Sequence, residues 1–241
     1  MKIRPSVCFI LLGLLLVLLF AADLLLGSVS LAAGEVVRVL TGHSSDPQAT
    51  TLVTHFRLPK AVSAIVVGAA LSASGLQMQT LFRNPLAGPY VLGISSGASL
   101  DVSLFLLGAP LLGISFASEA LRNVGIVGSA WIGGALILLV IMAVSARLKD
   151  IMAILILGMM FGSAASAVVQ ILQYLSTDSA LKSFVIWTMG SLGGVSLAQL
   201  GLMSGIVLAG LILSVYLIKP LNLLLLGENY ARTMGLNVRI T

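Results

Sequence analysis

The stretch from Arg57 to Ala98 reads RLPKAVSAIVVGAALSASGLQMQTLFRNPLAGPYVLGISSGA. A basic corner leads into an apolar segment, which breaks at the polar sequence Arg83-Asn84-Pro85 and is followed by a glycine-rich apolar segment. Proline lacks a backbone N–H and disfavours helical geometry at the residue before it. The stretch therefore predicts two apolar helices joined by a short polar turn.

The first of these helices carries small and polar residues at helical spacing. Gly68, Ser72, Gly75 and Gln79 fall at i, i+4, i+7 and i+11, which places them on one face. In a membrane, small residues let a neighbouring helix backbone approach closely, and a glutamine hydrogen-bonds across such a contact. The pattern predicts either a packing face or part of a translocation path.

The composition of the chain indicates a membrane protein. Of its 241 residues, 59% are hydrophobic and only 9% are charged, whereas soluble domains carry about 25% charged residues. The mean hydropathy is +1.13, and apolar runs of about 20 residues, enough to cross about 30 Å of hydrocarbon, recur along the chain. The 13 lysines and arginines form no basic stripe, which argues against nucleic-acid binding. We expect an all-α, polytopic membrane helical bundle.

Hydropathy predicts six membrane-spanning helices, with short interfacial helices between them. The first apolar run is longer than the roughly 7–15 residues usual in a cleaved signal peptide, so we expect it to be retained. Residues 27–56 should hold an interfacial helix and then a loop, and residues 176–194 a second interfacial helix anchored by Trp187. The last span should stop at Lys219-Pro220. The predicted spans cover residues 1–26, 60–81, 90–107, 124–145, 151–175 and 197–218.

One acidic residue, Asp101, lies inside the third predicted span. An ionisable side chain in a membrane helix is energetically costly and tends to face protein or water. Two interpretations remain open. Asp101 either lines a pathway, or it is a structural acid that lies near the interface or hydrogen-bonds to Ser99 or Ser103.

The sequence lacks the common motifs of catalysis and nucleotide binding. It has no GxxxxGK[ST] P-loop, no HExxH and no GxSxG. Cys8 is the single cysteine, which excludes an internal disulfide and a multi-cysteine metal site. Both histidines, His43 and His55, fall in the predicted outer loop. We expect no enzymatic activity, no cofactor and no metal site.

Several short motifs carry a resemblance to a known family. They are Arg57-Leu58-Pro59, Gly68-Ala69-Ala70-Leu71, Ser74-Gly75 with Gln79, Asn84-Pro85-Leu86-Ala87 with Pro89, Leu92-Gly93 with Gly97-Ala98, Trp187-Thr188-Met189-Gly190 with Gly193-Gly194, and Gly227-Glu228 with Ala231-Arg232 and Gly235-Leu236. With these motifs the chain, from about Leu31 to Thr241, resembles the permease subunits of bacterial ABC importers for iron–siderophore complexes, haem and cobalamin.

The resemblance implies the type II ABC importer permease fold, with residues 1–241 in one transmembrane permease domain of the bacterial inner membrane. It implies cytoplasmic ATP-binding subunits, a periplasmic or lipid-anchored substrate-binding protein and a second permease subunit, identical or different, with membrane lipid around them and no nucleic acid. The cargo would be an iron–siderophore, haem or cobalamin. The alternatives are a proton-coupled secondary transporter with Asp101 as its carrier acid, and a non-functional truncated permease.

The resemblance also implies where partners would dock. Arg57 and Lys60, at the outer end of the second span, would receive the binding protein, although Lys60 stands where the family has arginine. Residues 221–241 would form the cytoplasmic ATPase-coupling segment, in which Met234 stands where the family has leucine. The matching positions of that segment are Gly227, Glu228, Ala231, Arg232 and Gly235.

The translocation path and its inner gate are expected along the same spans. The turn near Asp150, Ile151 and Met152 corresponds to an inner gate, although these residues do not form a small hydroxyl-rich gate, and an ordinary tight turn is the alternative. Path or packing positions are Gly68, Ser72, Gly75, Gln79, Asn84, Pro85, Gly93, Gly97 and Asp101.

Family permeases have roughly ten spans, and their helices 2–5 and 7–10 form two related repeats. The resemblance therefore implies that the 241 residues stop in the cytoplasmic loop after the sixth span, apparently truncated, and lack the second repeat. We expect that this chain alone does not transport.

The charge distribution leads to a testable topology. With the N-terminus inside, eight of the thirteen lysines and arginines fall on the cytoplasmic side, as the positive-inside rule favours. Ser44 is then outside and Lys149 inside. After replacement of Cys8, single cysteines at these two positions should react oppositely with an impermeant thiol reagent in intact cells. Labelling of both from the same side would contradict the six-span topology.

Overall fold

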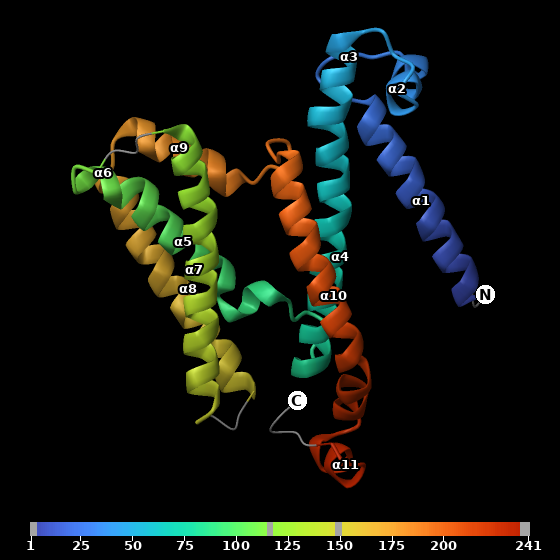
Figure 1. Ribbon diagram of the computed structural model, residues 1–241. Helices are drawn as coiled ribbons and strands as arrows, with labels where there is room; N and C mark the ends of the chain where they lie inside the picture. Colours follow the sequence, from blue (N-terminus) through green and yellow to red (C-terminus); the bar gives the residue numbers. More distant parts are fainter. Residues whose placement is uncertain (1–3, 115–117, 148–150, 237–241) are drawn as a thin grey trace. The chain divides into compact units, whose positions relative to one another are not determined.

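The computed structural model describes residues 4–114, 118–147 and 151–236, and these ranges are built from helices and the turns between them (Figure 1). Within these ranges, six segments are long and apolar enough to cross a membrane. The predicted all-α bundle with six spans is thereby confirmed. The segments are Pro5–Leu25, Pro47–Phe82, Ile94–Leu111, Glu119–Ser145, Met152–Leu175 and Leu197–Leu225.

The elements include two π-helical segments, η1 and η3, and one 3₁₀ segment, η2. In chain order the elements are α1 (Pro5–Leu25), α2 (Ala33–Leu40), α3 (Pro47–Thr51), η1 (Leu52–Arg57), α4 (Leu58–Phe82), η2 (Pro89–Leu92), α5 (Ile94–Ser103), η3 (Leu104–Gly108), α6 (Ala109–Leu111), α7 (Glu119–Ser145), α8 (Ile151–Leu175), α9 (Asp178–Met189), α10 (Leu197–Leu225) and α11 (Glu228–Thr233).

The second span begins earlier than the sequence predicts. The elements α3, η1 and α4 run without interruption from Pro47 to Phe82, although the expected start is near Lys60. The carboxylate of Asp46 caps this helix by accepting a hydrogen bond from the backbone N–H of Gln48 at 2.9 Å, and Pro47 occupies the first turn. The predicted loop before the span is therefore helical from Pro47 onward.

Three other spans also differ from the prediction. The fourth begins at Glu119, within a predicted outer loop, instead of at Val124. The third is interrupted at Gly93, whose φ of +74° separates η2 from α5. The last continues through Pro220 to Leu225, so the predicted stop at Lys219-Pro220 is wrong. A proline removes one backbone hydrogen bond, and membrane helices accommodate this loss when the freed carbonyl group finds another partner.

Internal contacts divide the chain into two compact units, Met1–Ala70 with Ser191–Val215, and Leu71–Gly190 with Tyr216–Thr241. In the first unit, α2 and α3 fold over the C-terminal end of α1 and the beginning of the second span (Figure 1). The short helix α2 is the interfacial helix predicted in this region. The buried core here consists of Leu24, Val36, Val39, Ala49, Val53 and Ala61.

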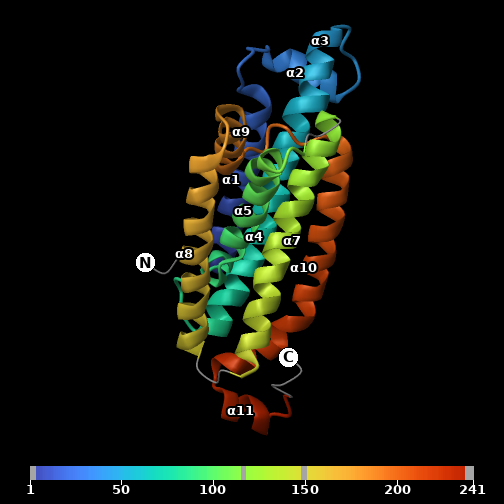
Figure 2. The same cartoon turned by 90° about the vertical axis from the view of Figure 1, so that its left-hand side faces the viewer.

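In the second unit, α5 lies between α7 and α8 (Figure 2). The helix α9 is the second predicted interfacial helix, and its Phe184 and Trp187 rings stack with centroids 6.1 Å apart. Phe184 is almost completely buried and closes the apolar core beside η3 and α8. The buried members of this core are Val102, Leu106, Leu107, Val169 and Phe184.

The backbone of α5 approaches its neighbours so closely that glycine is required at the contacts. A Cβ atom at Gly97 would lie 2.5 Å from the carbonyl oxygen of Gly133 on α7. On the other side, a Cβ atom at Gly93 would lie 2.9 Å from the carbonyl oxygen of Gly158 on α8. Neither neighbour is a flexible side chain that could move away. Small residues thus allow the close helix packing that stabilises membrane bundles.

The close contact at Gly97 predicts that adding one methyl group at this position lowers the stability of the protein. Gly97→Ala should destabilise the protein by about 1–3 kcal/mol, because overpacking against a backbone carbonyl forces the helices apart. Thermal unfolding in detergent measures the loss. Gly128→Ala on α7 is the matched control, since a Cβ atom there meets no atom within 4 Å. Equal melting temperatures for the two variants would contradict the close contact between α5 and α7.

Candidate functional site

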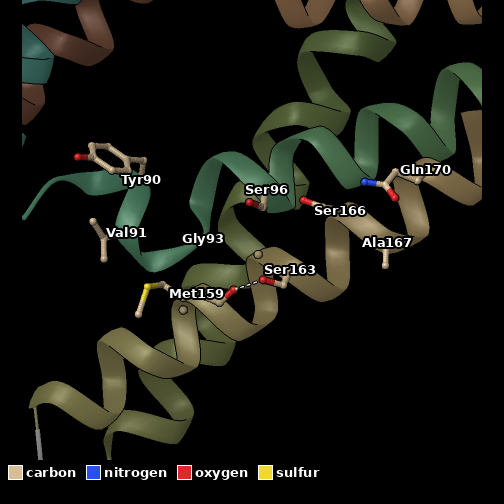
Figure 3. Close-up of a pocket in the computed structure, with 11 residues that line it drawn as sticks. Tyr90, Val91, Gly93, Ser96, Met159, Ser163, Ser166, Ala167 and Gln170 are labelled. Atoms are coloured by element: carbon tan, nitrogen blue, oxygen red, sulfur yellow. Dashed lines mark hydrogen bonds between the residues drawn. The ribbon is translucent and has the colours of Figure 1, made fainter.

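A polar groove lies between α5 and α8 in the second unit. Its main part has a volume of about 710 Å³. A second cavity of about 350 Å³ shares Ser96, Ser166 and Gln170 with the first, so the two form one groove along the helices. The main part is lined by Tyr90, Val91, Gly93, Ser96, Gly158, Met159, Gly162, Ser163, Ser166, Ala167 and Gln170 (Figure 3).

Helical spacing explains why one face of α8 is polar at this groove. Ser163, Ser166, Gln170 and Gln173 are separated by three, four and three residues, which keeps them on one side of the helix. These side chains interrupt an apolar span. Ser163, Ser166 and Gln170 are exposed and Gln173 is half-buried, so this polar side of α8 borders the groove with α5 and is open to the surroundings of the unit.

On the facing side, α5 contributes Ser95, Ser96 and Ser99. Figure 3 shows Ser96 of α5 and Ser166 of α8 next to one another at the groove. The absence of a side chain at Gly162 brings the helices together here, because a Cβ atom at Gly162 would lie only 3.1 Å from the Ser96 hydroxyl oxygen. Glycine on α8 and serine on α5 thus determine the width of the groove.

The groove is chemically neutral. Its lining residues offer hydroxyl and amide groups, backbone atoms and apolar surface, and none of them carries a charge. The Ser163 hydroxyl donates a hydrogen bond to the Met159 carbonyl oxygen at 3.0 Å within α8. Within the described residues there is no group of three or more His, Cys, Asp or Glu side chains suited to a metal ion. The arrangement suits reversible contact with a large polar molecule better than covalent chemistry.

The expected path residues are distributed over several environments. Gly93 lines the groove, whereas Gly97 faces α7. Asp101 is half-buried on the side of α5 that meets Gly133 of α7, and it does not line the groove. The Ser103 hydroxyl donates to the carbonyl oxygen of Leu100 at 2.6 Å, and the proposed bond to Asp101 is not formed.

On α4, Gly68 belongs to the first unit, and Ser72, Gly75 and Gln79 belong to the second. A Cβ atom at Gly68 or Gly75 would meet nothing within 4 Å, and Ser72 and Gln79 are exposed. At the polar break, the Asn84 side-chain oxygen accepts a hydrogen bond from the backbone N–H of Leu86 at 3.0 Å. Asn84 and Pro85 thus shape the turn that follows α4. Roles of all these residues in a translocation path remain predictions.

The expected inner gate is only partly described. Asp150 lies outside the described residues, Ile151 begins α8, and Met152 is exposed. A gating role for these three residues remains a prediction.

The expected coupling segment contains a short helix, α11, which starts at Glu228 and includes Arg232. Ala231 is fully buried, and Gly227 and Gly235 flank the helix with φ of +117° and +87°. The glycines are therefore required by backbone conformation at both ends of α11. Contact with an ATPase remains a prediction.

Arg57 and Lys60 have intramolecular partners in the first unit. The Arg57 side chain is only 6% exposed, and its guanidinium group donates to the carbonyl oxygens of Leu24 at 2.7 Å and Leu25 at 3.0 Å, and to that of Val29. The last carbonyl groups of a helix have no partner within the helix, so Arg57 caps the end of α1.

Lys60 forms a partly exposed ion pair with Asp23 at 2.7 Å. The geometry thus gives both cations an internal role in joining α1 to the start of the second span. Their proposed role in receiving a binding protein remains untested.

Sequence reasoning misses two parts of this geometry. The groove joins α5 and α8, which are far apart in sequence, and the regular spacing of Ser163, Ser166, Gln170 and Gln173 is the signal that predicts its α8 side. The capping bonds of Arg57 reach residues 28 to 33 positions earlier, and nothing local in the sequence indicates them.

Comparison with known proteins places the chain among membrane permeases. The model of the FecCD transport family matches residues 14–241. The hemin transport system permease protein HmuU of Yersinia pestis is 38% identical over 250 aligned residues, which cover 99% of this chain and 69% of that protein. The vitamin B12 import system permease protein BtuC of Escherichia coli O127:H6 is 37% identical over 208 residues, covering 86% and 60%.

A solved structure agrees with these matches. It is described as an inward-facing conformation of a metal-chelate type ABC transporter, and it superposes with a TM-score of 0.79 at 29% identity over 98% of this chain and 70% of that chain. The chain therefore spans between 60% and 70% of the length of these relatives. The matches confirm the resemblance carried by the sequence motifs, and the permease fold that it implies.

The burial of Arg57 predicts unequal effects for the two cations. Arg57→Met removes charged hydrogen bonds to buried carbonyl groups, which are worth about 1.5–3 kcal/mol each and leave acceptors unpaired when lost. Lys60→Met breaks a partly exposed ion pair worth about 0–1 kcal/mol. Arg57→Met should therefore lower the melting temperature in detergent clearly more than Lys60→Met. The reverse order would rule out the capping role of Arg57.

Proposed function

Because the chain belongs to the FecCD transport family, we propose that it acts as the transmembrane permease subunit of an ATP-binding-cassette importer for haem, cobalamin or an iron–siderophore. Its six apolar helices and its family make it a multi-pass protein of the inner membrane, as bacterial permeases of this family are. The observation that carries the proposal is the match of residues 14–241 to this family, and the uncharged polar groove between α5 and α8 supports it.

The chemistry of the groove supports a chelated cargo rather than a bare metal ion. Hydroxyl and amide groups form individually weak hydrogen bonds, so a large organic chelate can be held briefly and released. A free metal cation would favour carboxylate, imidazole or thiolate ligands, and the groove lining contains none of these. The names of the relatives, for hemin and for vitamin B12, agree with this class of cargo.

The energy for transport would come from partners. We expect cytoplasmic ATP-binding subunits to contact α11 and its flanking glycines, where Gly227, Glu228, Ala231, Arg232 and Gly235 match the family pattern. A substrate-binding protein would deliver the cargo outside, and a second permease subunit would complete the path. This subunit performs no covalent chemistry in the proposed cycle.

The position of Asp101 argues against a proton-coupled carrier. A carrier acid needs contact with both the cargo and a proton path. Asp101 lies on the α7 side of α5, beside Gly133, and does not line the groove. Import driven by ATP is therefore the better supported of the two mechanisms.

Reconstitution in proteoliposomes tests the proposal. The chain is combined with the ATP-binding subunit and the binding protein encoded with it, and uptake of hemin, cyanocobalamin and a ferric siderophore is measured with ATP or with a proton gradient. Because the chain spans 69% of the hemin permease and 60% of the vitamin B12 permease, the assay is run with and without a separately expressed segment that covers the remainder of such a relative. Uptake of one cargo should require ATP.

Two variants connect this uptake to the groove. Ser166→Phe places a large side chain in the groove and should reduce uptake by about tenfold or more, since it removes the space for cargo. Ile171→Phe is the matched control, because Ile171 is 59% exposed on α8 and does not line the groove. Equal uptake by both variants would exclude the groove as the path, and uptake that follows a proton gradient without ATP would exclude the importer.

A further inference from the structure

The end of α4 has an unusual residue in a common capping motif. The backbone N–H of Arg83 donates to the carbonyl oxygen of Thr80 at 3.3 Å, and that of Asn84 donates to Gln79 at 3.1 Å. This pair of bonds is the Schellman motif, in which the residue just after the helix adopts the left-handed conformation. Here that residue is Arg83, with φ of +48°.

The same hydrogen-bond pattern ends three other helices, each time with glycine at this position. The motif closes α2 at Gly42, α6 at Gly113 and α11 at Gly235, with φ of +74°, +73° and +87°. Among the residues that the structure describes, Arg83 is the single non-glycine residue with positive φ. An L-residue adopts this conformation at an energetic cost that glycine avoids. At Arg83 this cost must therefore be offset by contacts of the arginine side chain, which glycine lacks.

The guanidinium group of Arg83 forms a hydrogen bond with the end of α10. Nη2 of Arg83 donates to the carbonyl oxygen of Leu224 at 2.7 Å, which links residues 141 positions apart within the second unit. Leu224 lies in the last turn of α10, and its carbonyl oxygen also accepts from the backbone N–H of Gly227 at 3.1 Å. A cation is favourable at a helix C-terminus, where carbonyl groups lack helical partners.

The link lies directly before α11. Arg83 lines an open cavity of about 690 Å³ together with Leu226, Gly227 and the polar residues Asn229, Tyr230 and Thr233 of α11. The hydrogen bond from Arg83 to Leu224 is exposed beside this cavity, so it does not lie in a packed apolar core. The bond from Arg83 to Leu224 is thus a specific connection between the start of the coupling segment and the turn after α4.

From the other side of Arg83 the chain leads directly to the groove. The turn at Asn84 and Pro85 is followed by η2, and Gly93 at its end lines the groove beside α8. Only nine residues lie between Arg83 and Gly93. A displacement at Arg83 therefore has a short covalent route to the groove.

We propose that Arg83 is a positioning residue that couples α11 to the groove, by holding the end of α10 against the turn after α4. Movement of α11 on an ATPase would then displace the turn at Asn84 and, through η2, the groove wall at Gly93. This inference rests on the proposed function, in which α11 contacts the ATPase. The physical link itself can be tested without any partner.

The first experiment measures the link directly in the 241-residue chain. After Cys8→Ser, nitroxide labels are attached at Leu81→Cys near the end of α4 and at Met234→Cys after α11, both of which are exposed positions. Double electron–electron resonance should give a narrow distance distribution. Arg83→Gly retains the backbone turn and removes the guanidinium group, so it should broaden the distribution. Arg83→Lys, which keeps a cation, should restore part of the narrow component.

A melting curve distinguishes a positioning role of Arg83 from a role in the overall stability of the protein. Glycine avoids the cost of the left-handed conformation in the Schellman position, which offsets the loss of the exposed hydrogen bond to Leu224. Arg83→Gly should therefore leave the melting temperature nearly unchanged even as the distance distribution broadens. Lys219→Gln is the control, because it removes an exposed cation from α10 without touching the link. An unchanged distribution in Arg83→Gly would overturn the proposal.

The second experiment measures coupling with the ATP-binding subunit in proteoliposomes. Stimulation of ATP hydrolysis by the permease should fall about fivefold in Arg83→Gly, within the usual range of coupling between two sites, while the ATPase still binds. Wild-type stimulation in a variant with a broadened distance distribution would overturn the coupling role. Absence of stimulation by the wild-type chain together with a narrow distribution would instead refute the proposed function and leave the link from Arg83 to Leu224 intact.

Discussion

The close approach of the α5 backbone to α7 and α8 is the constraint on which the second unit depends. Gly97 and Gly133 meet on one side, and Gly93 and Gly158 on the other, at distances that leave no room for a Cβ atom. In a bilayer the helices gain little from burying apolar surface, because lipid is equally apolar, so packing and interhelical hydrogen bonds hold them together. Glycine at these contacts therefore decides where α5 lies.

The groove is a consequence of the same packing. Once α5 is fixed against α8 at Gly93 and Gly158, the serines of α5 face the polar side of α8. A continuous apolar contact would have filled this space. Hydroxyl and amide groups instead line a neutral groove, which we propose receives the chelated cargo. The close packing of α5 against α8 therefore accounts both for the position of α5 and for the groove on which the proposed path depends.

Local patterns in the sequence predict the six spans, because each apolar run is long enough to cross the bilayer, and they predict both interfacial helices. The same patterns misplace the ends of spans. Pro220 predicts a stop, yet α10 passes through it, and the cap at Asp46 starts the second span before Lys60. The groove, the Arg57 cap and the Arg83 link join distant residues, so no local pattern reveals these pairings, although the spacing of polar residues on α8 indicates one wall of the groove. Arg83 is part of a predicted polar break, but its left-handed conformation is seen only in the structure.

Disulfide cross-linking across the groove tests the packing of α5 against α8 most directly. A Cβ atom at Gly162 would lie 3.8 Å from Cβ of Ser96, within the range of about 3.5–4.5 Å found in disulfides. In a Cys8→Ser chain in membranes, Ser96→Cys with Gly162→Cys should lose both thiols under mild oxidation, as mass spectrometry would show. The control pair, Ser96→Cys with Met160→Cys, places the second thiol at an exposed position outside the groove lining and should keep both. Equal oxidation of the two pairs, or none in the first, would contradict the account.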